Sequence, residues 1–414
     1  MAANKNNKAL NVPHLRFPEF SGEWVTKSIN DLAVVIGGGT PDTTVKSYWD
    51  GEIQWFTPSE IGKNKYVDSS LRTITEEGLN NSSAKLLSPN TILLSSRATI
   101  GECSLSLREC ATNQGFQSLV SKKCNVDFLY YLIQTKKKDL IRKSCGSTFL
   151  EISANEVRKI QVSVPSDVEQ QKIAELLSLI DERIATQNKI IEDLKKLKSA
   201  ICEKLFCSPK DKQPKVRLHG FSNYWNFVRL SDICHRIRRK NTEEQCKRVL
   251  TIAAQYGLVS QEEFFNKNVA SENLSGYYLL QNGDFAYNKS YSGDYVWGTV
   301  KRLDNYEQGV LSPLYICFCP DSAKVDSDFL VYYFESKKWH KAVADIAGEG
   351  ARNHGLLNIS VIDYFNTIHC IPSMDEQKQI AQIMSALLSK IAREQRMLNC
   401  YTTQRQYLLR QMFI

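Results

Sequence analysis

The sequence predicts an α+β fold: two globular mixed α/β domains in a tandem pseudo-two-fold repeat, separated by a long antiparallel two-helix coiled coil. Three observations predict it. Stretches of the first half return in the second half, each copy contains short strand-like runs, and each copy ends in a long helical pattern. A repeat of about 200 residues is far longer than the roughly 20–50 residues of a solenoid unit, so it represents two copies of a whole domain.

Three stretches carry the repeat, and the offset between copies grows from 201 residues at the start to 207 near the end. They are Pro13–Trp24 with Pro214–Trp225, Asp127–Tyr131 with Asp328–Tyr332, and Val164–Ala174 with Ile371–Ala381. We therefore expect six parts along the 414 residues. In order, they are an N-terminal segment (1–24), domain one (25–150), a central spacer region with a long helix (151–207), a linker with the N-terminal segment of the second copy (208–225), domain two (226–350) and a distal spacer region with a long helix (351–414).

Local patterns place strands and helix starts inside these parts. Thr91–Ser95 in domain one and Leu314–Cys319 in domain two are apolar, β-rich runs that predict strands. Asp167 and Asp375 precede the two long helical patterns, and both are predicted to be N-caps.

The long helices, expected near 167–206 and 375–413, carry seam residues at alternating spacings of four and three, the pattern of a coiled coil. Of ten seam positions in each helix, eight are apolar in both helices and the same two are polar in both. The apolar positions are Ile173, Leu177, Ile180, Ile184, Ile191, Leu194, Ile201 and Leu205, and then Ile380, Met384, Leu387, Ile391, Leu398, Tyr401, Leu408 and Met412. The alternative is two ordinary amphipathic helices, each packed on its own domain. Roughly 40 residues would span about 60 Å, however, which exceeds one face of a small domain.

Connectivity predicts the direction of the helices. The first helix leads through the linker to domain two, and the second helix needs a partner of its own length, so it is expected to run back along the first. Full overlap would place the polar seam residues Lys198 near Leu387 and Arg405 near Ile180. Either these cations extend outward to water or the register is shifted.

Composition narrows the class of protein. The net charge of +8 favours an anionic partner. The twelve cysteines form no Cys-x-x-Cys pair, so we interpret them as reduced, buried thiols of a cytoplasmic protein rather than as metal ligands. The polar N-terminus lacks a signal-peptide core and no apolar run approaches 18 residues, so no membrane association is expected.

The common catalytic motifs are absent from the sequence. It contains no phosphate-binding P-loop, no Gly-x-Gly-x-x-Gly turn, no nucleophile elbow and no Asn-Pro-Pro-aromatic or Asp-Pro-Pro-Tyr loop of an amino-methyltransferase. No catalytic or metal-binding residue is therefore predicted on this chain.

Cations and amides in loops of both domains favour a surface that contacts nucleic acid. Arginine and lysine can reach guanine or a phosphate, and asparagine and glutamine suit adenine edges. Arg97 lies in a loop after a strand-like run, and Lys289 occupies a comparable place in domain two. For each residue alone, a solvated surface charge or a structural turn is the competing interpretation, and for Arg97 it is an ion pair with an acidic neighbour. The candidates are Lys63, Lys65, Arg97, Thr99, Asn113 and Gln114 in domain one, and Arg236, Arg238, Arg239, Lys240, Asn288, Lys289, Tyr291, Arg352 and Asn353 in domain two.

These motifs resemble a known family. Gly37–Pro41 together with Asn113–Phe116 resembles one class of target-recognition domain in type I restriction–modification specificity subunits. Leu250–Val259, Gly283–Ser292 and Leu311–Phe318 resemble another class from the same family. The helix openings match the spacer helices of that family, so the resemblance covers essentially the whole chain. Domain two lacks the Gly-Gly-Gly-Thr-Pro motif, which fits two domains that read different sequences.

The resemblance implies a non-catalytic subunit that binds a bipartite site on double-stranded DNA, one half for each domain. It also implies two modification subunits that methylate adenine, with restriction subunits joining that core. S-adenosylmethionine, ATP and magnesium would belong to those partners, and this chain would bind no cofactor. Two other functions stay open: a self-contained DNA-modifying enzyme, and a coiled-coil scaffold that does not bind DNA.

Overall fold

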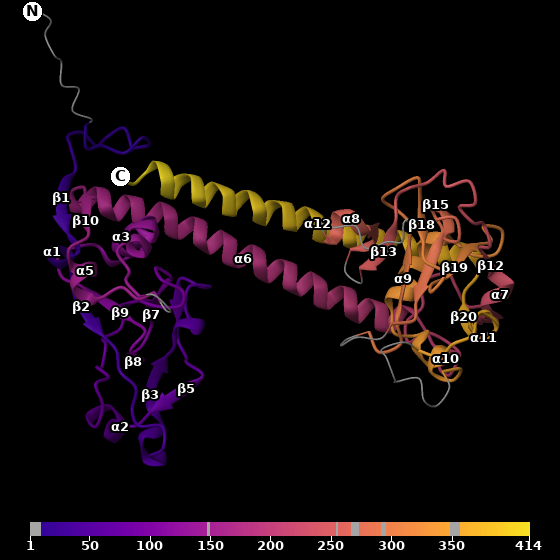
Figure 1. The fold of residues 1–414 in the computed structure, drawn as a ribbon, viewed down its shortest axis with the longest axis horizontal. Helices are drawn as coiled ribbons and strands as arrows, with labels where there is room; N and C mark the ends of the chain where they lie inside the picture. The colour runs from indigo at the N-terminus through magenta and orange to yellow at the C-terminus, as the bar shows by residue number, and fades with distance from the viewer. Residues whose placement is uncertain (1–9, 147–149, 254–255, 266–272, 291–294, 348–356) are drawn as a thin grey trace, which may run out of the picture. The chain divides into compact units, whose positions relative to one another are not determined.

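The computed structural model describes residues 10–146, 150–253, 256–265, 273–290, 295–347 and 357–414 (Figure 1). The chain forms two compact units: unit 1 is Met1–Lys189 with Gln395–Ile414, and unit 2 is Ile190–Glu394. Both long helices, α6 (Asp167–Leu205) and α12 (Met374–Gln411), contribute residues to each unit. The compact units therefore do not coincide with the sequence copies, because each unit includes the end of the other copy's helix.

Unit 1 is built on a five-stranded sheet in the order β2-β9-β6-β7-β4. A three-stranded sheet, β5-β3-β8, and the pair β1-β10 complete its strands. The strands are β1 (Val25–Ser28), β2 (Ala33–Gly37), β3 (Trp49–Phe56), β4 (Tyr66–Val67), β5 (Arg72–Ile74), β6 (Ile92–Leu94), β7 (Cys103–Ser106), β8 (Cys110–Thr112), β9 (Gln117–Ser121) and β10 (Gln161–Val164). The short helices are α1 (Ile29–Leu32), η1 (Lys46–Tyr48), η2 (Pro58–Glu60), α2 (Glu76–Asn80), α3 (Val126–Thr135), α4 (Lys137–Arg142) and α5 (Ala154–Arg158).

Unit 2 is built on a four-stranded sheet in the order β12-β19-β16-β17, with three further strand pairs, β11-β20, β13-β14 and β15-β18. The strands are β11 (Asn226–Arg229), β12 (Cys234–Arg236), β13 (Leu250–Ala253), β14 (Gly257–Ser260), β15 (Tyr278–Gln281), β16 (Phe285–Asn288), β17 (Thr299–Arg302), β18 (Gln308–Leu311), β19 (Ile316–Pro320) and β20 (Ile368–Ile371). The short helices are α7 (Leu230–Ile233), α8 (Gln261–Phe265), α9 (Ser327–Glu335), α10 (His340–Ala344) and α11 (Val361–Phe365).

The two units share one sheet framework. Strands β2, β9, β6 and β7 of unit 1 occupy the same order as β12, β19, β16 and β17 of unit 2. The strands predicted at Thr91–Ser95 and Leu314–Cys319 are present as β6 and β19, one in each framework. The units differ in what is added to this framework: unit 1 adds the β5-β3-β8 sheet, whereas the described part of unit 2 adds the pairs β13-β14 and β15-β18. Below, residues 25–164 and 226–371 are called the sheet bodies of unit 1 and unit 2.

Matching aromatic clusters join a helix end to each sheet body. In unit 1, Phe413, just past the end of α12, stacks on Phe128 of α3 with ring centroids 5.3 Å apart and lies 6.4 Å from Trp24. In unit 2, Phe206, just past α6, lies 5.5 Å from Phe329, which in turn lies 6.3 Å from Trp225. Because large buried aromatic rings contribute much of a core's burial, these clusters anchor the helix ends.

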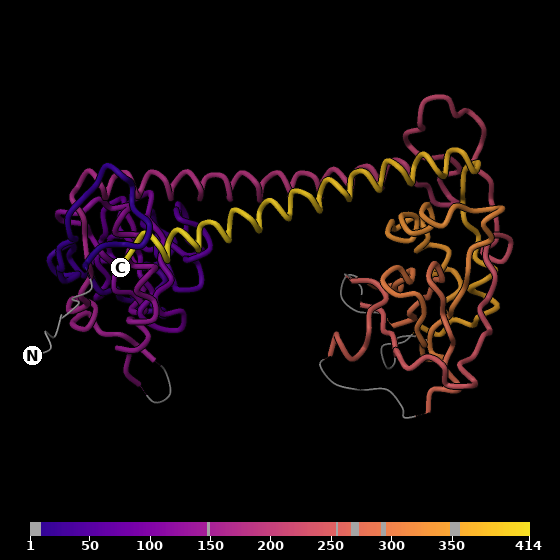
Figure 2. Tube along the Cα trace, turned by 90° about the horizontal axis from the view of Figure 1, so that it is seen from above, coloured from indigo at the N-terminus to yellow at the C-terminus, as the bar shows by residue number. Residues whose placement is uncertain are grey.

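The same cores establish that the long helices are antiparallel. In unit 1, Leu408 and Met412 near the end of α12 share a core with Ile173 and Leu177 near the start of α6. The end of α12 lies beside the start of α6 in both views of the chain (Figure 1, Figure 2). In unit 2, the residues that follow α6 share a core with Ile380, near the start of α12. Each predicted seam position on both helices is buried or half-buried, whereas most residues between them are exposed.

The helix starts differ slightly from the prediction. Helix α6 begins at Asp167 itself, and Ser166 accepts a hydrogen bond from the Glu169 amide at 3.5 Å. Helix α12 begins at Met374, so Asp375 also lies inside the first turn. The N-cap prediction was therefore wrong for both aspartates, although a carboxylate in the first turn is favourable to the helix dipole. In the described part of the chain, no helix is both long and apolar enough to cross a membrane.

Candidate nucleic-acid interface

Three loops of unit 1 leave the same edge of its main sheet. Gly37, the last residue of β2, pairs with Gln117, the first residue of β9. Ser95, directly after β6, bridges to Phe116, directly before β9. Antiparallel pairing therefore brings together the loop after β2, the loop after β6 and the turn before β9. We call these segments (38–48, 95–102 and 113–116) the loop edge of unit 1.

The Gly-Gly-Gly-Thr-Pro motif packs directly against the Asn-Gln-Gly turn at this edge. The Gly39 amide donates to the Thr112 carbonyl at 2.8 Å, and the Thr40 hydroxyl donates to the Gln114 side chain at 2.5 Å. A Cβ atom at Gly38 would lie 2.0 Å from the Asn113 carbonyl oxygen, so only glycine fits this approach. The two motifs are separate in the sequence but form one surface.

Arg97 lies in the loop after β6, at the same edge. Its side chain is half-buried, and within the described residues no hydrogen bond or ion pair engages the guanidinium group. The loop around it is ordered: the Ser96 amide donates to the Gly115 carbonyl at 2.8 Å, and Thr99 donates to Ser95 at 3.1 Å. The nearest acidic residue in this loop, Glu102, pairs with Lys137 instead. Among the residues described, the ion pair considered from the sequence for Arg97 is not formed.

Unit 2 presents the equivalent edge. Arg236 at the end of β12 pairs with Phe318 of β19, and Tyr287 near the end of β16 pairs with Ile316, where β19 begins. The loops after β12, after β16 and before β19 consequently leave one edge of the sheet. We call the described residues 237–249, 289–290, 295–298 and 312–315 the loop edge of unit 2. Lys289, directly after β16, occupies the place that the loop bearing Arg97 occupies after β6.

The cations of unit 2 fall into two groups at this edge. Arg238 is exposed and has no partner among the described residues, and the Lys289 side chain is half-buried and likewise without one. By contrast, Lys240 lies over the Tyr278 ring at 3.6 Å, and Arg239 pairs with Asp284. The first group is available for an anion.

Several predicted DNA contacts have internal roles. Asn113 accepts a hydrogen bond from the Gly115 amide at 2.8 Å, which shapes the turn, and Asn288 does the same for Ser290 at 2.9 Å. Arg236 approaches the Tyr278 hydroxyl at 3.4 Å, a weak contact that leaves it exposed. The predictions for Tyr291, Arg352 and Asn353 lie outside the described residues.

Lys63 and Lys65 line a cavity beside the long helices. The Lys65 side chain is only 7% exposed, and its ammonium group forms an ion pair with Asp127 at 2.6 Å. The DNA contact predicted for Lys65 stays a prediction. Lys63 is exposed at the rim of a cavity of about 550 Å³ that residues of α6 and α12 also line. Sequence could not separate these lysines from the loop cations, because their surroundings depend on contacts between distant segments.

Sequence reasoning overlooked Thr40, whose hydroxyl fixes the side chain of Gln114 at the loop edge. The signal was present, because Thr40 belongs to the Gly-Gly-Gly-Thr-Pro motif. Among the residues that the structure describes, no group of three or more His, Cys, Asp or Glu side chains could hold a metal ion. The loop edges thus offer cations, amides and hydroxyls, which suit binding to a phosphate backbone and base edges.

Comparison with protein families gives two matches along the chain. The family described as "Type I restriction modification DNA specificity domain" matches residues 21–196 and again residues 223–399. Each match includes one sheet body and part of the long helix that follows it.

Similar curated proteins carry related names. The chain is 39% identical over 180 residues to the type I restriction enzyme MjaIX specificity subunit of Methanocaldococcus jannaschii, covering 42% of each chain. It is 31% identical over 175 residues to the EcoR124I/EcoR124II specificity subunit of Escherichia coli, covering 40% of this chain and 43% of the relative. Each alignment thus spans less than half of the relative. A longer alignment, 24% identical over 392 residues, covers 90% of this chain and 87% of the MjaVIII specificity subunit of M. jannaschii.

Solved structures share the fold along nearly the whole chain. The S subunit of a type I restriction–modification system from M. genitalium has a TM-score of 0.57 at 16% identity, covering 97% of this chain and 99% of that one. A chain from a study of complex assembly and conformational transition of the type I system has a TM-score of 0.56 at 14% identity, covering 94% and 97%. At these identities the likeness is one of fold.

Proposed function

Because the chain belongs to the type I restriction–modification DNA specificity family, we propose that it is the non-catalytic subunit that reads a bipartite site on double-stranded DNA, one half for each unit. The observation that carries this proposal is the recurrence of one sheet edge in both units with different loops on it. Equivalent frameworks would approach two half-sites in equivalent ways, and unlike loops would read unlike bases.

The chemistry of the loop edges supports DNA as the ligand. Arg97 in unit 1 and Arg238 and Lys289 in unit 2 are long cations without partners among the described residues. Contacts from such side chains neutralise phosphates or pair with guanine. Gln114, held by Thr40, offers an amide of the kind that reads adenine.

The long helices are proposed to set the gap between the half-sites and to hold the partners. Their repeated surfaces give two equivalent docking sites for modification subunits, and restriction subunits would join through these. S-adenosylmethionine, ATP and magnesium would then be bound by the partners. A measured mass with one modification subunit per chain, at saturating partner, would contradict the two-site arrangement.

Methylation of a host genome tests the proposed reading function. The chain is expressed with its modification subunit in a host without adenine methylation, and methyladenine is mapped by single-molecule sequencing. We expect one motif with two defined halves and a fixed gap of unspecified bases. Scattered methylation without a bipartite motif would overturn the proposal.

Two control measurements address the alternative functions. Methylation of DNA by the purified chain with S-adenosylmethionine and no partner would identify a self-contained enzyme. Absence of a mobility shift on DNA, for the chain with its modification subunit, would identify a scaffold that does not bind DNA.

A further inference from the structure

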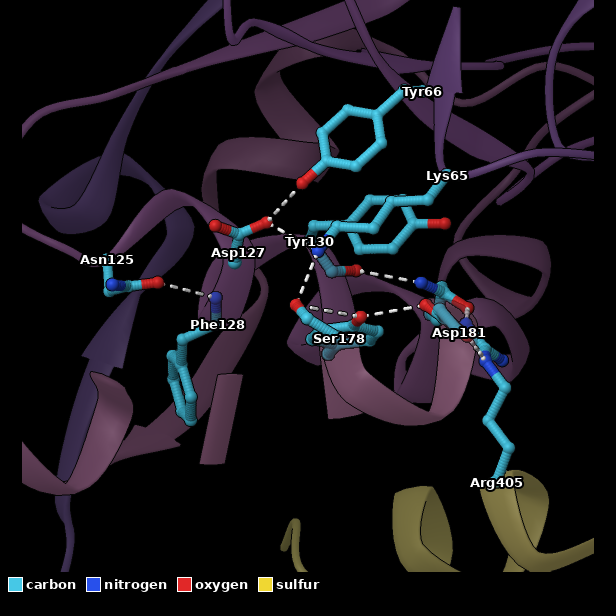
Figure 3. A network of polar contacts seen from close by, with 11 residues as sticks. Lys65, Tyr66, Asn125, Asp127, Phe128, Tyr130, Ser178, Asp181 and Arg405 are labelled. Carbon is cyan, nitrogen blue, oxygen red and sulfur yellow. Dashed lines mark hydrogen bonds and ion pairs between the residues drawn. The ribbon is translucent and has the colours of Figure 1, made fainter. Parts of the chain in front are cut away.

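A polar network joins the sheet body of unit 1 to both long helices (Figure 3). Its centre is Asp181 of α6, which accepts hydrogen bonds from Tyr131 of α3 at 2.7 Å and from Arg405 of α12 at 2.5 Å. Arg405 also donates to Gln134 of α3 at 2.9 Å. One guanidinium group thus contacts a residue from each of the two elements that face it.

The network continues through Lys65, which lines the cavity and directly precedes β4. Its ammonium group contacts Asp127 of α3 at 2.6 Å and Ser178 of α6 at 2.7 Å (Figure 3). Tyr131 lies 3.3 Å from the same Ser178 hydroxyl. Sheet, α3, α6 and α12 are therefore linked by polar groups within unit 1.

Because these side chains are largely buried, their contacts restrict the orientation of the elements more than pairs on the open surface would. The side chains of Asp181 and Arg405 are 17% and 19% exposed. Burial and the Asp181 carboxylate raise the pKa of Tyr131, so its hydroxyl stays protonated as a donor. The surrounding apolar contacts hold the elements together but tolerate sliding, because hydrophobic attraction has no direction. The planar fork of an arginine fixes angles as well as distances.

Unit 2 has an ion pair at the equivalent place, formed by different residues; we call this pair and the Arg405–Asp181 pair of unit 1 the helix clamps. Position 405 corresponds to Lys198 on α6, which pairs with Glu335 at the end of α9 at 2.7 Å. Glu335 stands where Gln134 stands in unit 1, and Leu388 stands where Asp181 stands. Each unit therefore has a cation at the same seam position, on the long helix that starts in the other unit. Its acidic partner comes from a long helix in unit 1 and from the sheet body in unit 2. Neither Lys198 nor Arg405 extends freely to water, which was one of the two arrangements expected for these polar seam residues.

We propose that Arg405 is a positioning residue: through Asp181 and Gln134 it fixes the orientation of the sheet body of unit 1 on the two helices, and so sets which gap between half-sites is accepted. This proposal rests on the proposed function. Apolar packing of the sheet body on the helices would, by itself, tolerate gaps between half-sites that differ by one base pair. A fixed orientation of the loop edge excludes those neighbouring gaps.

The test compares genome methylation at different gaps. The full chain is expressed with its modification subunit, and methylation of the same two half-sites is counted at the wild-type gap and at gaps one base pair shorter and longer. For Arg405→Met, we expect the ratio of neighbouring-gap to wild-type-gap methylation to rise about tenfold. Arg410→Met is the matched control, because Arg410 is exposed on the same helix and has no partner among the described residues; its ratio should not change.

The conservative Arg405→Lys variant keeps the experiment decisive, because losing a half-buried charge weakens folding. It retains the charge but not the fork, so the ratio should rise to a value between wild type and Arg405→Met. An unchanged ratio in both variants, with methylation lowered equally at all gaps, would show that Arg405 only stabilises the fold and would overturn the proposal. If the wild-type chain gives no bipartite motif, the proposed function fails instead.

Discussion

The two units share a sheet framework, but their loop edges differ in chemistry. The edge of unit 1 contains close-packed glycines around Gln114, and Arg97, which has no side-chain partner in the part of the chain that the structure describes. Unit 2 has no such glycine motif and instead carries Arg238, Lys240 and Lys289. The comparison teaches that strand order positions the reading surface, whereas loop composition decides how it reads. We expect unit 1 to depend on shape and amides and unit 2 to depend more on charge.

The helix clamps show the same division. Both units keep a cation at the same seam position, yet Arg405 pairs with an acid from the neighbouring helix and Lys198 with an acid from the sheet body. The same position on the long helix is thus paired in both units, but with acids from different elements.

The largest effect is expected from Gly38→Ala in unit 1. The new Cβ atom would meet the Asn113 carbonyl at 2.0 Å, so the loop edge must deform. Overpacking of this kind costs about 1–3 kcal/mol of unfolding free energy, and methylation of the bipartite motif should be lost. The control is Gly276→Ala in unit 2, where a Cβ meets nothing within 4 Å. Normal methylation and stability of Gly38→Ala would mean that the close packing is not required.

A smaller effect is expected from pH, and it should reside in unit 2. His369 is fully buried between Tyr333 and Thr367, and burial lowers its pKa to about 4. Below the ordinary histidine pKa, the unfolded chain binds a proton at this residue while the folded chain keeps it neutral. The contribution of His369 to the free energy of unfolding is therefore complete above the ordinary histidine pKa and is lost as pH falls towards 4. Between pH 7 and 5, the loss should be about 2 kcal/mol.

Chemical denaturation at several pH values measures this loss. Unit 1 has Val162 at the equivalent position, so no matching effect is expected there. The His369→Gln variant should have a flatter dependence of unfolding free energy on pH. An unchanged dependence would assign the acid sensitivity to other groups.

The smallest effect concerns salt. If Lys289 contacts a phosphate, Lys289→Ala should weaken binding to all DNA sequences alike and reduce the slope of log affinity against log salt by about one unit. Arg97→Ala in unit 1 should instead relax one position of the motif, because a base contact discriminates between sequences. Binding titrations of the complex at several salt concentrations separate the two outcomes. Equal salt slopes for wild type and Lys289→Ala would remove the phosphate contact from the account.

The long helices and the framework strands were predictable because their signals are local. Seam spacing identifies α6 and α12 over many turns, and the β-rich runs identify β6 and β19. The comparable placement of Arg97 and Lys289 also followed from the sequence, since both lie in the loop that follows a framework strand, β6 and β16 respectively.

Contacts between distant segments were not predictable in this way. The role of Lys65 depends on Asp127 and Ser178, and that of Arg405 on Asp181, more than 200 residues away. No periodicity records such pairs, because many surface acids could satisfy the same cation. The errors at the helix starts, one residue at α6 and two at α12, have a different cause. Serine and aspartate both suit the beginning of a helix, and at α6 Ser166 takes the capping position.

The central claim is that each unit reads one half-site independently. It is tested most directly by replacing residues 25–150 with the corresponding segment of a related specificity subunit and mapping genome methylation with the same modification subunit. The account predicts that one half of the motif changes while the other half stays the same. A motif changed in both halves, or unchanged in both, would contradict it.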